Sequence, residues 1–320
     1  YNTKVAASVP SGTGPNIINL YYGWLPLYIN SGYLKPLPHS DFAPADIEEE
    51  FFSLVSAAKI DGHYYALPTA VRSLALFYNK RLFEEAGLDP EEPPKTLEEF
   101  EEYAIKLTKR DNAGNLLQSG FHTSLRGQNH HWIREVLVRQ YGGQPYSDDN
   151  RKVQYDSQPG YDAFDFYTTL ALEHKVGETE FMTDDVTAFK SQRSGMTIDG
   201  SFRIGTLDKV NGLDYEIAEL PSHNGIKSNF ASFWANGITN FTEGEELEAS
   251  IKFLKFLTSD TAMQLWLENV GELPAKESAA FTEENINHPK YGPFIKGLDY
   301  AHATYFVDET SQRQVWIDAF

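Results

Sequence analysis

The chain has 320 residues and a formal net charge of −19, with a sequence pI near 4.8. This acidity argues against a nucleic-acid-binding protein, because the phosphates of nucleic acids need Lys and Arg partners. A mean hydropathy of −0.44 and the absence of an apolar run near ~18 residues exclude a membrane-spanning helix, and a chain without cysteine has no disulfide framework.

The first predicted strand covers Asn16 to Tyr21 (NIINLY), directly after turn-forming glycine and proline residues. In open α/β sheets, ligands bind outside the carboxyl ends of the strands. Tyr22 and Trp24 follow this strand at once, so both are candidate ligand-binding residues. For Trp24, the alternative is that its ring packs against the helix that follows.

The clearest pattern comes next. Leu74 to Tyr78 (LALFY) is a short apolar run with aromatic residues, which is typical of a strand buried on both faces. Lys80 to Ala86 is predicted to form a short helix that ends at Gly87, a residue type that readily takes the left-handed conformation. Thr96 and Glu99 have the spacing of a capping box, which predicts the start of a second, amphipathic helix.

A further helix is predicted over Ile133 to Tyr141, after the adjacent residues His130 and His131. This histidine pair does not predict a metal site, because neighbouring side chains diverge and no third ligand lies at a helical spacing. The sequence therefore predicts no bound metal.

Further helices and strands are predicted in the C-terminal half. Tyr161 to His174 has the apolar spacing of a helix, and Gly195 to Asp199 (GMTID) reads as a short strand. Phe230 to Thr239 (FASFWANGIT) is apolar and aromatic, which fits a strand that crosses between two lobes. Thr242 and Glu245 have capping-box spacing, which predicts the start of a long helix.

The ordered set of segments resembles a known family. In chain order, the segments are SGTGPNIINL with GWLPLYINSGYLKPL, YNK with LFEEAGLDP and PPKT, SGMTIDGSF, FASFWANGITN, FLKFLTSD and GELPAKESA. They resemble the extracellular solute-binding proteins of bacterial ABC importers, in the sugar-binding group related to maltose-binding protein. The resemblance implies an α/β, two-lobed periplasmic-binding-protein fold of type II, in which the lobes are discontinuous and are joined by hinge crossings.

The resemblance also divides the chain. The first lobe is expected over residues 1–70 plus 239–272, and the second over residues 75–235 plus 275–320. The hinge crossings are expected near residues 69–74, 232–238 and 272–275. Members of the family normally have an N-terminal strand and helix before this point and a further C-terminal helix, so we expect the 320 residues to be a portion of a longer protein.

Sugar recognition needs apolar platforms for the C–H faces of the ring and polar groups for its hydroxyls. By resemblance, Trp132 stands where relatives carry an aromatic residue that stacks on a sugar, and Phe202 stands where many relatives have Trp. Arg72 lies where relatives vary widely. The predicted ligand-binding residues are Tyr22, Trp24, Arg72, Ser73, His131, Trp132, Asp199, Phe202, Phe233, Trp234 and Arg313.

The predicted function is high-affinity binding of a mono- or oligosaccharide in a cleft between the lobes and its delivery to the membrane permease subunits of an ABC importer. The resemblance implies a monomeric periplasmic or extracellular protein, with a lipid anchor in the precursor as one option. No cofactor, catalytic residue or nucleic-acid partner is predicted, and the sequence has no GxSxG, HExxH or P-loop motif.

Two alternatives stay open. One is a glycerophosphodiester receptor of the same fold, in which Arg72 or Arg313 meets a phosphate. The other is a secreted carbohydrate-active enzyme, which needs two carboxylates about 5 to 10 Å apart across a cleft. Only Asp199 is an acid at a predicted strand end.

Overall fold

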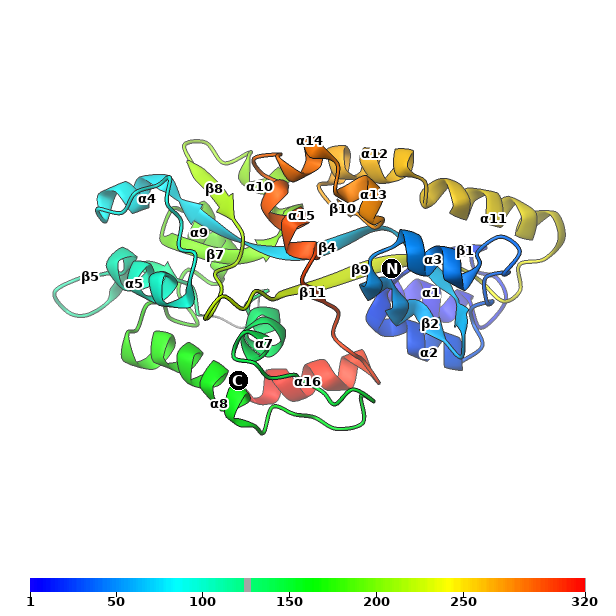
Figure 1. The fold of residues 1–320 in the computed structure, drawn as a ribbon, viewed down its shortest axis with the longest axis horizontal. Coiled ribbons are helices and arrows are strands. Elements are labelled where there is room, and N and C mark those ends of the chain that lie inside the picture. Colours follow the sequence, from blue (N-terminus) through cyan, green and yellow to red (C-terminus); the bar gives the residue numbers. More distant parts are fainter. Residues whose placement is uncertain (124–127, 320) are drawn as a thin grey trace. The chain divides into compact units, whose positions relative to one another are not determined.

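The computed structural model describes residues 1–123 and 128–319. The chain forms two compact units, each built from strands and helices that are distant in sequence (Figure 1). Unit 1 comprises Tyr1–Arg72, Ala231–Thr282 and Ala303–Phe320, and unit 2 comprises Ser73–Phe230 and Glu283–His302. No helix among the described residues combines the length and the apolar character needed to cross a bilayer.

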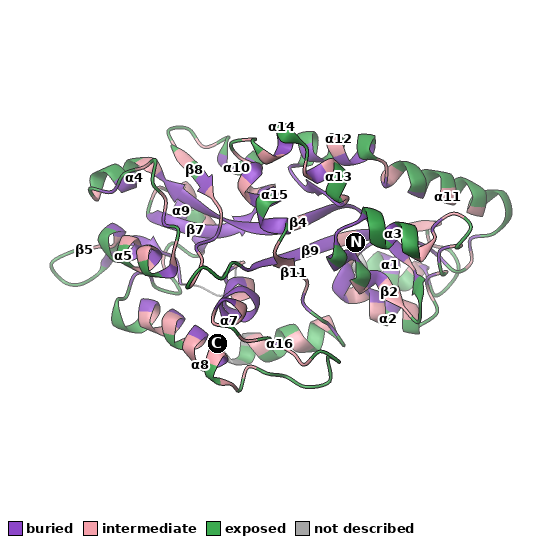
Figure 2. Cartoon of the chain, in the orientation of Figure 1, coloured by how far each residue is buried: buried purple, intermediate pink, exposed green. Residues whose placement is uncertain are grey.

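Two long strands, β4 and β9, contribute residues to both units. β4 runs from Ala66 to Asn79 as one nearly continuous buried strand, so the predicted crossing and the predicted strand at Leu74 to Tyr78 are parts of a single element. β9 covers Asn229–Ile238. Most of the β4 and β9 ribbon carries the colour of buried residues in Figure 2. Apolar side chains therefore continue on both faces of these strands, as expected of a sheet covered on both sides.

Unit 1 is organised by antiparallel pairing along β9 and β4. β1 pairs with β9, and the short β10 pairs with β4. In chain order the elements are α1 (Asn2–Ser8), β1 (Ile17–Tyr21), η1 (Tyr22–Trp24), α2 (Leu25–Asn30), α3 (Pro44–Glu50), η2 (Ser53–Ala58), β2 (Lys59–Ile60), β3 (His63–Tyr64), α11 (Gly244–Leu257), α12 (Asp260–Val270), β10 (Leu273–Pro274), α13 (Glu277–Ala280) and α16 (Glu309–Ala319).

Unit 2 is built on β4, which pairs antiparallel with both β7 and β8, while β6 runs parallel to β7. The helices that precede β6 and β7 in the chain cover the faces of these strands. In chain order the elements are α4 (Lys80–Glu85), α5 (Leu97–Leu107), β5 (Lys109–Arg110), β6 (Leu116–Phe121), α6 (Asn129–His131), η3 (Trp132–Leu137), α7 (Val138–Gln140), α8 (Gln158–Thr168), η4 (Thr169–Glu173), α9 (Asp185–Lys190), β7 (Ser194–Gly200), η5 (Ser201–Arg203), α10 (Ile204–Leu207), β8 (Tyr215–Ala218), α14 (Glu283–Ile286), α15 (Gly292–Leu298) and β11 (Ala301–His302).

The N-termini of α5 and α11 test the two predicted capping boxes. At α5, Thr96 accepts a hydrogen bond from the amide of Glu99 and Glu99 reaches back to Thr96, so the predicted capping box is confirmed. At α11 the predicted capping box is wrong, because Glu243 occupies the N-cap and no side chain caps the helix. The hydroxyl of Thr242 instead bonds to Thr239 (2.9 Å), which ties the end of β9 to the chain before β1.

The units differ from the predicted lobes at the C-terminal end. Residues 275–282 and 303–320 group with unit 1, whereas the prediction placed 275–320 in the second lobe. The physical reason is that Phe306 packs on Tyr21 and Tyr22 and that Glu309 accepts a hydrogen bond from Trp24. The chain also passes between the units after residues 72, 230, 282 and 302.

The core of unit 2 depends on close packing of α5 on β6. Phe100 of α5 contacts Phe121 of β6, with ring centroids 5.1 Å apart, and both rings contact Trp132. Gly120 permits this approach, because a Cβ there would overlap the carbonyl oxygen of Ala104. The absent side chain is thus what lets the helix rest on the strand.

Replacing Gly120 by Ala is expected to lower the free energy of unfolding by about 1–3 kcal/mol, because the added methyl group pushes α5 off the strand. Gly205→Ala in α10 is the matched control, since nothing lies within 4 Å of a Cβ built there. Urea denaturation followed by circular dichroism measures both variants. Equal stabilities would contradict the packing described for Gly120.

Candidate functional site

Six aromatic side chains gather at the carboxyl end of β1 in unit 1. They are defined as the aromatic cluster and comprise Tyr21, Tyr22, Trp24, Phe233, Trp234 and Phe306. The register of β1 and β9 places Tyr21 opposite Trp234, and the helical turn η1 begins directly after Tyr21. The strand pairing and the turn therefore bring together residues that lie more than two hundred positions apart.

The cluster has a buried layer and a partly exposed layer. Because successive strand residues point to opposite faces, Phe233 and Trp234 cannot lie on the same side of β9. Phe233 is fully buried and stacks on the buried Tyr22, with ring centroids 4.9 Å apart. Trp234 is only partly buried and meets Trp24 edge to face, with centroids 5.3 Å apart. The ligand roles predicted for Tyr22 and Phe233 are therefore corrected to core packing, whereas the rings of Trp24 and Trp234 keep exposed surface.

Glu309 and Phe306, both from the C-terminal segment of unit 1, hold the partly exposed rings in place. Glu309 accepts a hydrogen bond from Trp24 Nε1 (3.2 Å) and also faces the guanidinium of Arg313 (3.6 Å), whose side chain is largely exposed. Gly23 allows the rings to close up, because a Cβ there would lie 2.8 Å from Phe306. Sequence reasoning missed Phe306 and Glu309, because neither belongs to a recognisable pattern and both approach the cluster only through the fold.

Arg72 lies at the edge of unit 1 and is paired with a carboxylate. The register of β10 on β4 sets Leu273 opposite Val71, which brings Glu272 next to Arg72. Arg72 donates from Nε to Glu272 Oε1 (2.9 Å) and forms an ion pair with the same oxygen through Nη2. Arg72 remains a candidate, but its charge is balanced by the mostly buried Glu272.

The side chain of Ser73 points into unit 2. Its hydroxyl is buried and donates to the carbonyl oxygen of Phe294 in α15 (2.8 Å). The predicted ligand role is corrected to a structural one, because a buried hydroxyl must find a protein partner and this one has done so.

A second polar site lies at the carboxyl end of β7 in unit 2. Asp199 is 2% exposed and accepts hydrogen bonds from the amide of Gly200 (2.7 Å) and from Nε of Arg203 (2.5 Å). Burial raises the pKa of Asp199, and the guanidinium of Arg203 opposes that rise. The half-buried ring of Phe202 lies 5.5 Å from the guanidinium carbon of Arg203. Arg203, which was not predicted, is thus the solvent-facing member of this group.

Asp185 lies in the same buried environment. It starts α9 and accepts a hydrogen bond from the hydroxyl of Thr197 (3.3 Å), and burial raises the pKa of its carboxyl. Asp185 is, like Asp199, 2% exposed. Neither carboxyl can therefore reach a bond in a bulky substrate.

The residues predicted around the helix that follows residue 128 separate into two roles. Trp132 exposes none of its surface and is enclosed by Phe100, Phe121 and Phe166 of unit 2. Its predicted stacking role is corrected to a core role. His131 is half-buried and stacks face to face on Phe230, with centroids 3.8 Å apart, so it stays a candidate. The segment η3 (Trp132–Leu137) is a π-helix, and all six of its residues are buried.

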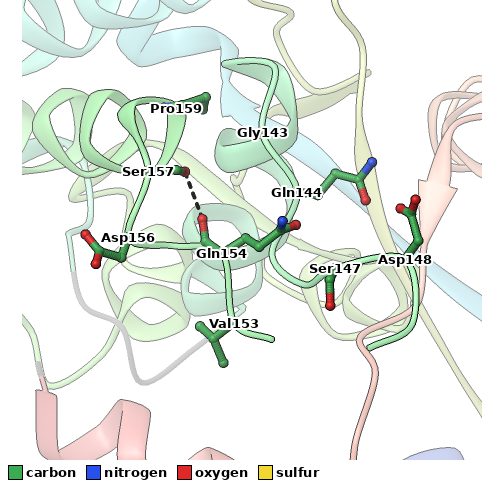
Figure 3. Close-up of a pocket in the computed structure, with 9 residues that line it drawn as sticks. All are labelled: Gly143, Gln144, Ser147, Asp148, Val153, Gln154, Asp156, Ser157 and Pro159. Atoms are coloured by element: carbon green, nitrogen blue, oxygen red, sulfur yellow. Dashed lines mark hydrogen bonds between the residues drawn. The ribbon is translucent and has the colours of Figure 1, made fainter. Parts of the chain in front are cut away.

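A pocket of about 550 Å³ lies elsewhere in unit 2 (Figure 3). Its walls come from one chain segment between Gly143 and Pro159, which is folded on itself by backbone hydrogen bonds from Gln154 to Pro145 and from Ser147 to Lys152 (both 2.9 Å). None of the predicted ligand-binding residues lines it. The aromatic cluster and the Asp199–Arg203 pair have the better chemistry for ligand recognition, because they combine ring faces with oriented donors. In the part of the chain that the structure describes, no three His, Asp or Glu side chains gather as metal ligands.

Comparison with known proteins identifies the family to which this chain belongs. Residues 1–293 match the family described as bacterial extracellular solute-binding protein. The chain belongs to this family. The predicted family and the predicted α/β fold of two-lobed solute-binding proteins are therefore confirmed.

Two relatives and one solved structure show the range of similarity. The chain is 24% identical to the maltotriose-binding protein of Pyrococcus abyssi over 308 residues, which covers 93% of this chain and 62% of that protein. It is 25% identical to the sn-glycerol-3-phosphate-binding periplasmic protein of Escherichia coli K12, covering 91% of this chain and 72% of that protein. A solute-binding protein of an ABC transporter from Thermotoga lettingae, solved with bound α-D-tagatose, matches with a TM-score of 0.77 and 25% identity, covering 95% of this chain and 78% of that one.

The layered cluster predicts opposite consequences for neighbouring residues. Phe233→Ala is expected to destabilise the protein by about 3–5 kcal/mol, because it removes a fully buried ring and leaves a cavity against Tyr22. Trp234→Ala is the matched variant on the other face of β9 and is expected to cost much less. Guanidinium denaturation measures both. If Trp234→Ala is the more destabilising change, the assignment of the two layers is reversed.

Proposed function

We propose that this chain binds a neutral mono- or oligosaccharide outside the cytoplasm and delivers it, as a monomer, to the permease subunits of an ABC importer. The observation that carries the proposal is the pair of partly exposed indoles, Trp24 and Trp234, held at right angles at the carboxyl end of β1. Family membership supports extracytoplasmic solute binding. The names of the maltotriose-binding relative and of the tagatose-bound structure support a saccharide as the solute.

The geometry of the indole pair suits a sugar ring. A pyranose presents C–H groups on its faces and hydroxyl groups around its edge, so it is bound by an aromatic face together with nearby polar groups. Trp24 is fixed by its hydrogen bond to Glu309, so little side-chain entropy is lost when a ligand stacks on it. Arg313 and Arg72 supply donors within the same unit.

The rival ligand within the family is a phosphate-bearing one, since a relative is named for sn-glycerol 3-phosphate. A phosphate is bound best by guanidinium groups whose charge is not already balanced. Arg72 is paired with Glu272, and Arg313 faces Glu309. A phosphate at either arginine would meet a carboxylate as well, so these pairs favour an uncharged ligand.

The enzyme alternative has less support. A glycosidase needs two carboxyl groups that flank the scissile bond. The two acids near the end of β7, Asp185 and Asp199, are both almost inaccessible. We therefore propose a non-catalytic receptor without a cofactor.

Product analysis after prolonged incubation with maltotriose tests this proposal, and turnover that scales with protein concentration would contradict it.

A thermal-shift panel of maltotriose, maltose, mannobiose, tagatose and sn-glycerol 3-phosphate tests the ligand class. At one hundred times its dissociation constant, a ligand stabilises the native protein by about 2.7 kcal/mol. We expect at least one neutral saccharide to raise the melting temperature and glycerol phosphate to leave it unchanged. A shift with glycerol phosphate alone would replace this proposal with the phosphate-ligand reading.

Trp24→Ala and Trp234→Ala are each expected to weaken saccharide binding about tenfold or more, since loss of an aromatic stacking partner removes on the order of 1–3 kcal/mol. Trp266→Ala is the matched control, because Trp266 lies on α12 of the same unit and is 40% exposed but outside the cluster. Isothermal titration calorimetry with the tightest-binding saccharide of the panel gives the three affinities. Equal losses in all three variants, or no loss at the cluster, would refute the platform.

A further inference from the structure

Arg203 has a role that neither the sequence pattern nor the family match assigns. It is the last residue of η5, one helical turn after Asp199 at the carboxyl end of β7. The turn brings Nε of Arg203 within 2.5 Å of Asp199 Oδ2. The side chain of Arg203 is 24% exposed, whereas that of Asp199 is 2% exposed. Of these two residues, only Arg203 can therefore touch a molecule that arrives from solvent.

The guanidinium group of Arg203 is held by one hydrogen bond and has further donors available. Arginine has five N–H donors in a planar fork, and only Nε donates a hydrogen bond to any of the residues described in the structure. The ring of Phe202 lies 5.5 Å from the guanidinium carbon and limits its rotation from one side. The two terminal amino groups are therefore oriented in advance, with donors to offer to a ligand.

The charge around Arg203 is negative on balance. Asp199 neutralises the guanidinium by direct contact, and the carboxyls of Asp184 and Asp185 also interact with it electrostatically. A phosphate at the terminal amino groups would be repelled by three carboxylates. Hydroxyl oxygens carry no charge, so they can accept the same hydrogen bonds without that repulsion.

We propose that Arg203 is the ligand-contacting donor of unit 2, that Asp199 positions and neutralises it, and that this pair selects the hydroxyl groups of an uncharged sugar over a phosphate. The proposal rests on the function proposed above and assigns a specificity-determining residue to it. It also changes the role of Asp199 from a direct ligand contact, as the sequence predicted, to a positioning residue. Phe202 then acts as the platform beside the donor.

The first test measures anion selectivity without requiring any sugar. Inorganic phosphate is titrated by calorimetry at fixed ionic strength into the wild type and into Asp199→Asn, which retains an acceptor for Nε but removes the neutralising charge. We expect the variant to bind phosphate about tenfold tighter or more, by the charge-assisted hydrogen bonds that Arg203 can then make. A gain that persists in the double variant Asp199→Asn/Arg203→Ala would overturn the role of Arg203.

Asp184→Asn is the matched control for net charge. Asp184 caps α9 by accepting from the amide of Thr187 (2.6 Å) and does not bond to Arg203, and Asn is an equally good capping residue. Because Asp184 acts on Arg203 only at longer range, its removal is expected to raise the phosphate affinity much less than Asp199→Asn does. A gain equal to that of Asp199→Asn would show that overall charge, and not the ion pair, sets selectivity.

The second test measures the neutral ligand. Arg203→Ala and Arg203→Lys are titrated with the tightest-binding of maltotriose, maltose, mannobiose and tagatose, and both are expected to bind about tenfold more weakly or worse, since Lys cannot reproduce the planar fork. Arg193→Ala is the control, because Arg193 is an exposed arginine just before β7. Unchanged affinity in both Arg203 variants would overturn the contact.

The two tests can fail independently of each other. If none of the four saccharides binds the wild type, the proposed function fails and the sugar selectivity of Arg203 fails with it. The phosphate titration still decides in that case whether Asp199 neutralises Arg203. Melting temperatures of all variants are measured first, and a folded Asp199→Asn that gains no phosphate affinity contradicts the pair directly.

Discussion

The pairing of β1 with β9 is the constraint on which the candidate site in unit 1 depends. Its register places Tyr21 opposite Trp234, and the alternation of side chains along β9 then leaves no choice about Phe233, which must point the other way. A shift of one residue would exchange the two faces, burying Trp234 and exposing Phe233. The strand pairing therefore decides which rings form core and which remain for a ligand.

Charge balance is the second recurring feature. Arg72, Arg203 and Arg313 each face a carboxylate of their own unit, namely Glu272, Asp199 and Glu309. A guanidinium held in this way keeps some donors, loses its net attraction for anions and moves little. Such groups suit a ligand that offers many hydroxyls and no charge. The exposed fraction of each arginine, and not its formal charge, then sets what it can contact.

The sequence predicted features that depend on neighbours in the chain. The capping box at Thr96 and the left-handed Gly87 are confirmed, because both are set by local backbone geometry. The capping box predicted at Thr242 is wrong, since that hydroxyl bonds to Thr239 and to the carbonyl oxygen of the distant Asn16 instead of to the helix end. Local patterns fail where a distant segment offers a better partner.

The candidate site was harder to predict for the same reason. Trp132 and Phe233 are aromatic residues of the type that stacks on sugars, but both are buried. Trp132 is enclosed by rings of unit 2, and strand alternation turns Phe233 toward Tyr22. Arg203 and Glu309 carry no motif and acquire a role only through their contacts with Asp199 and Trp24. Residue types near strand ends were thus predictable, whereas the direction of each side chain required the fold.

The central claim is that a neutral saccharide lies against the exposed indoles of unit 1. The chain has five tryptophans, so a proton–nitrogen correlation spectrum has five indole signals that can be assigned by substitution and followed during a maltotriose or tagatose titration. The account predicts that the signals of Trp24 and Trp234 shift and saturate together, while those of the buried Trp132 and of Trp266 on α12 stay in place. Saturable shifts confined to Trp132 or Trp266 would contradict it.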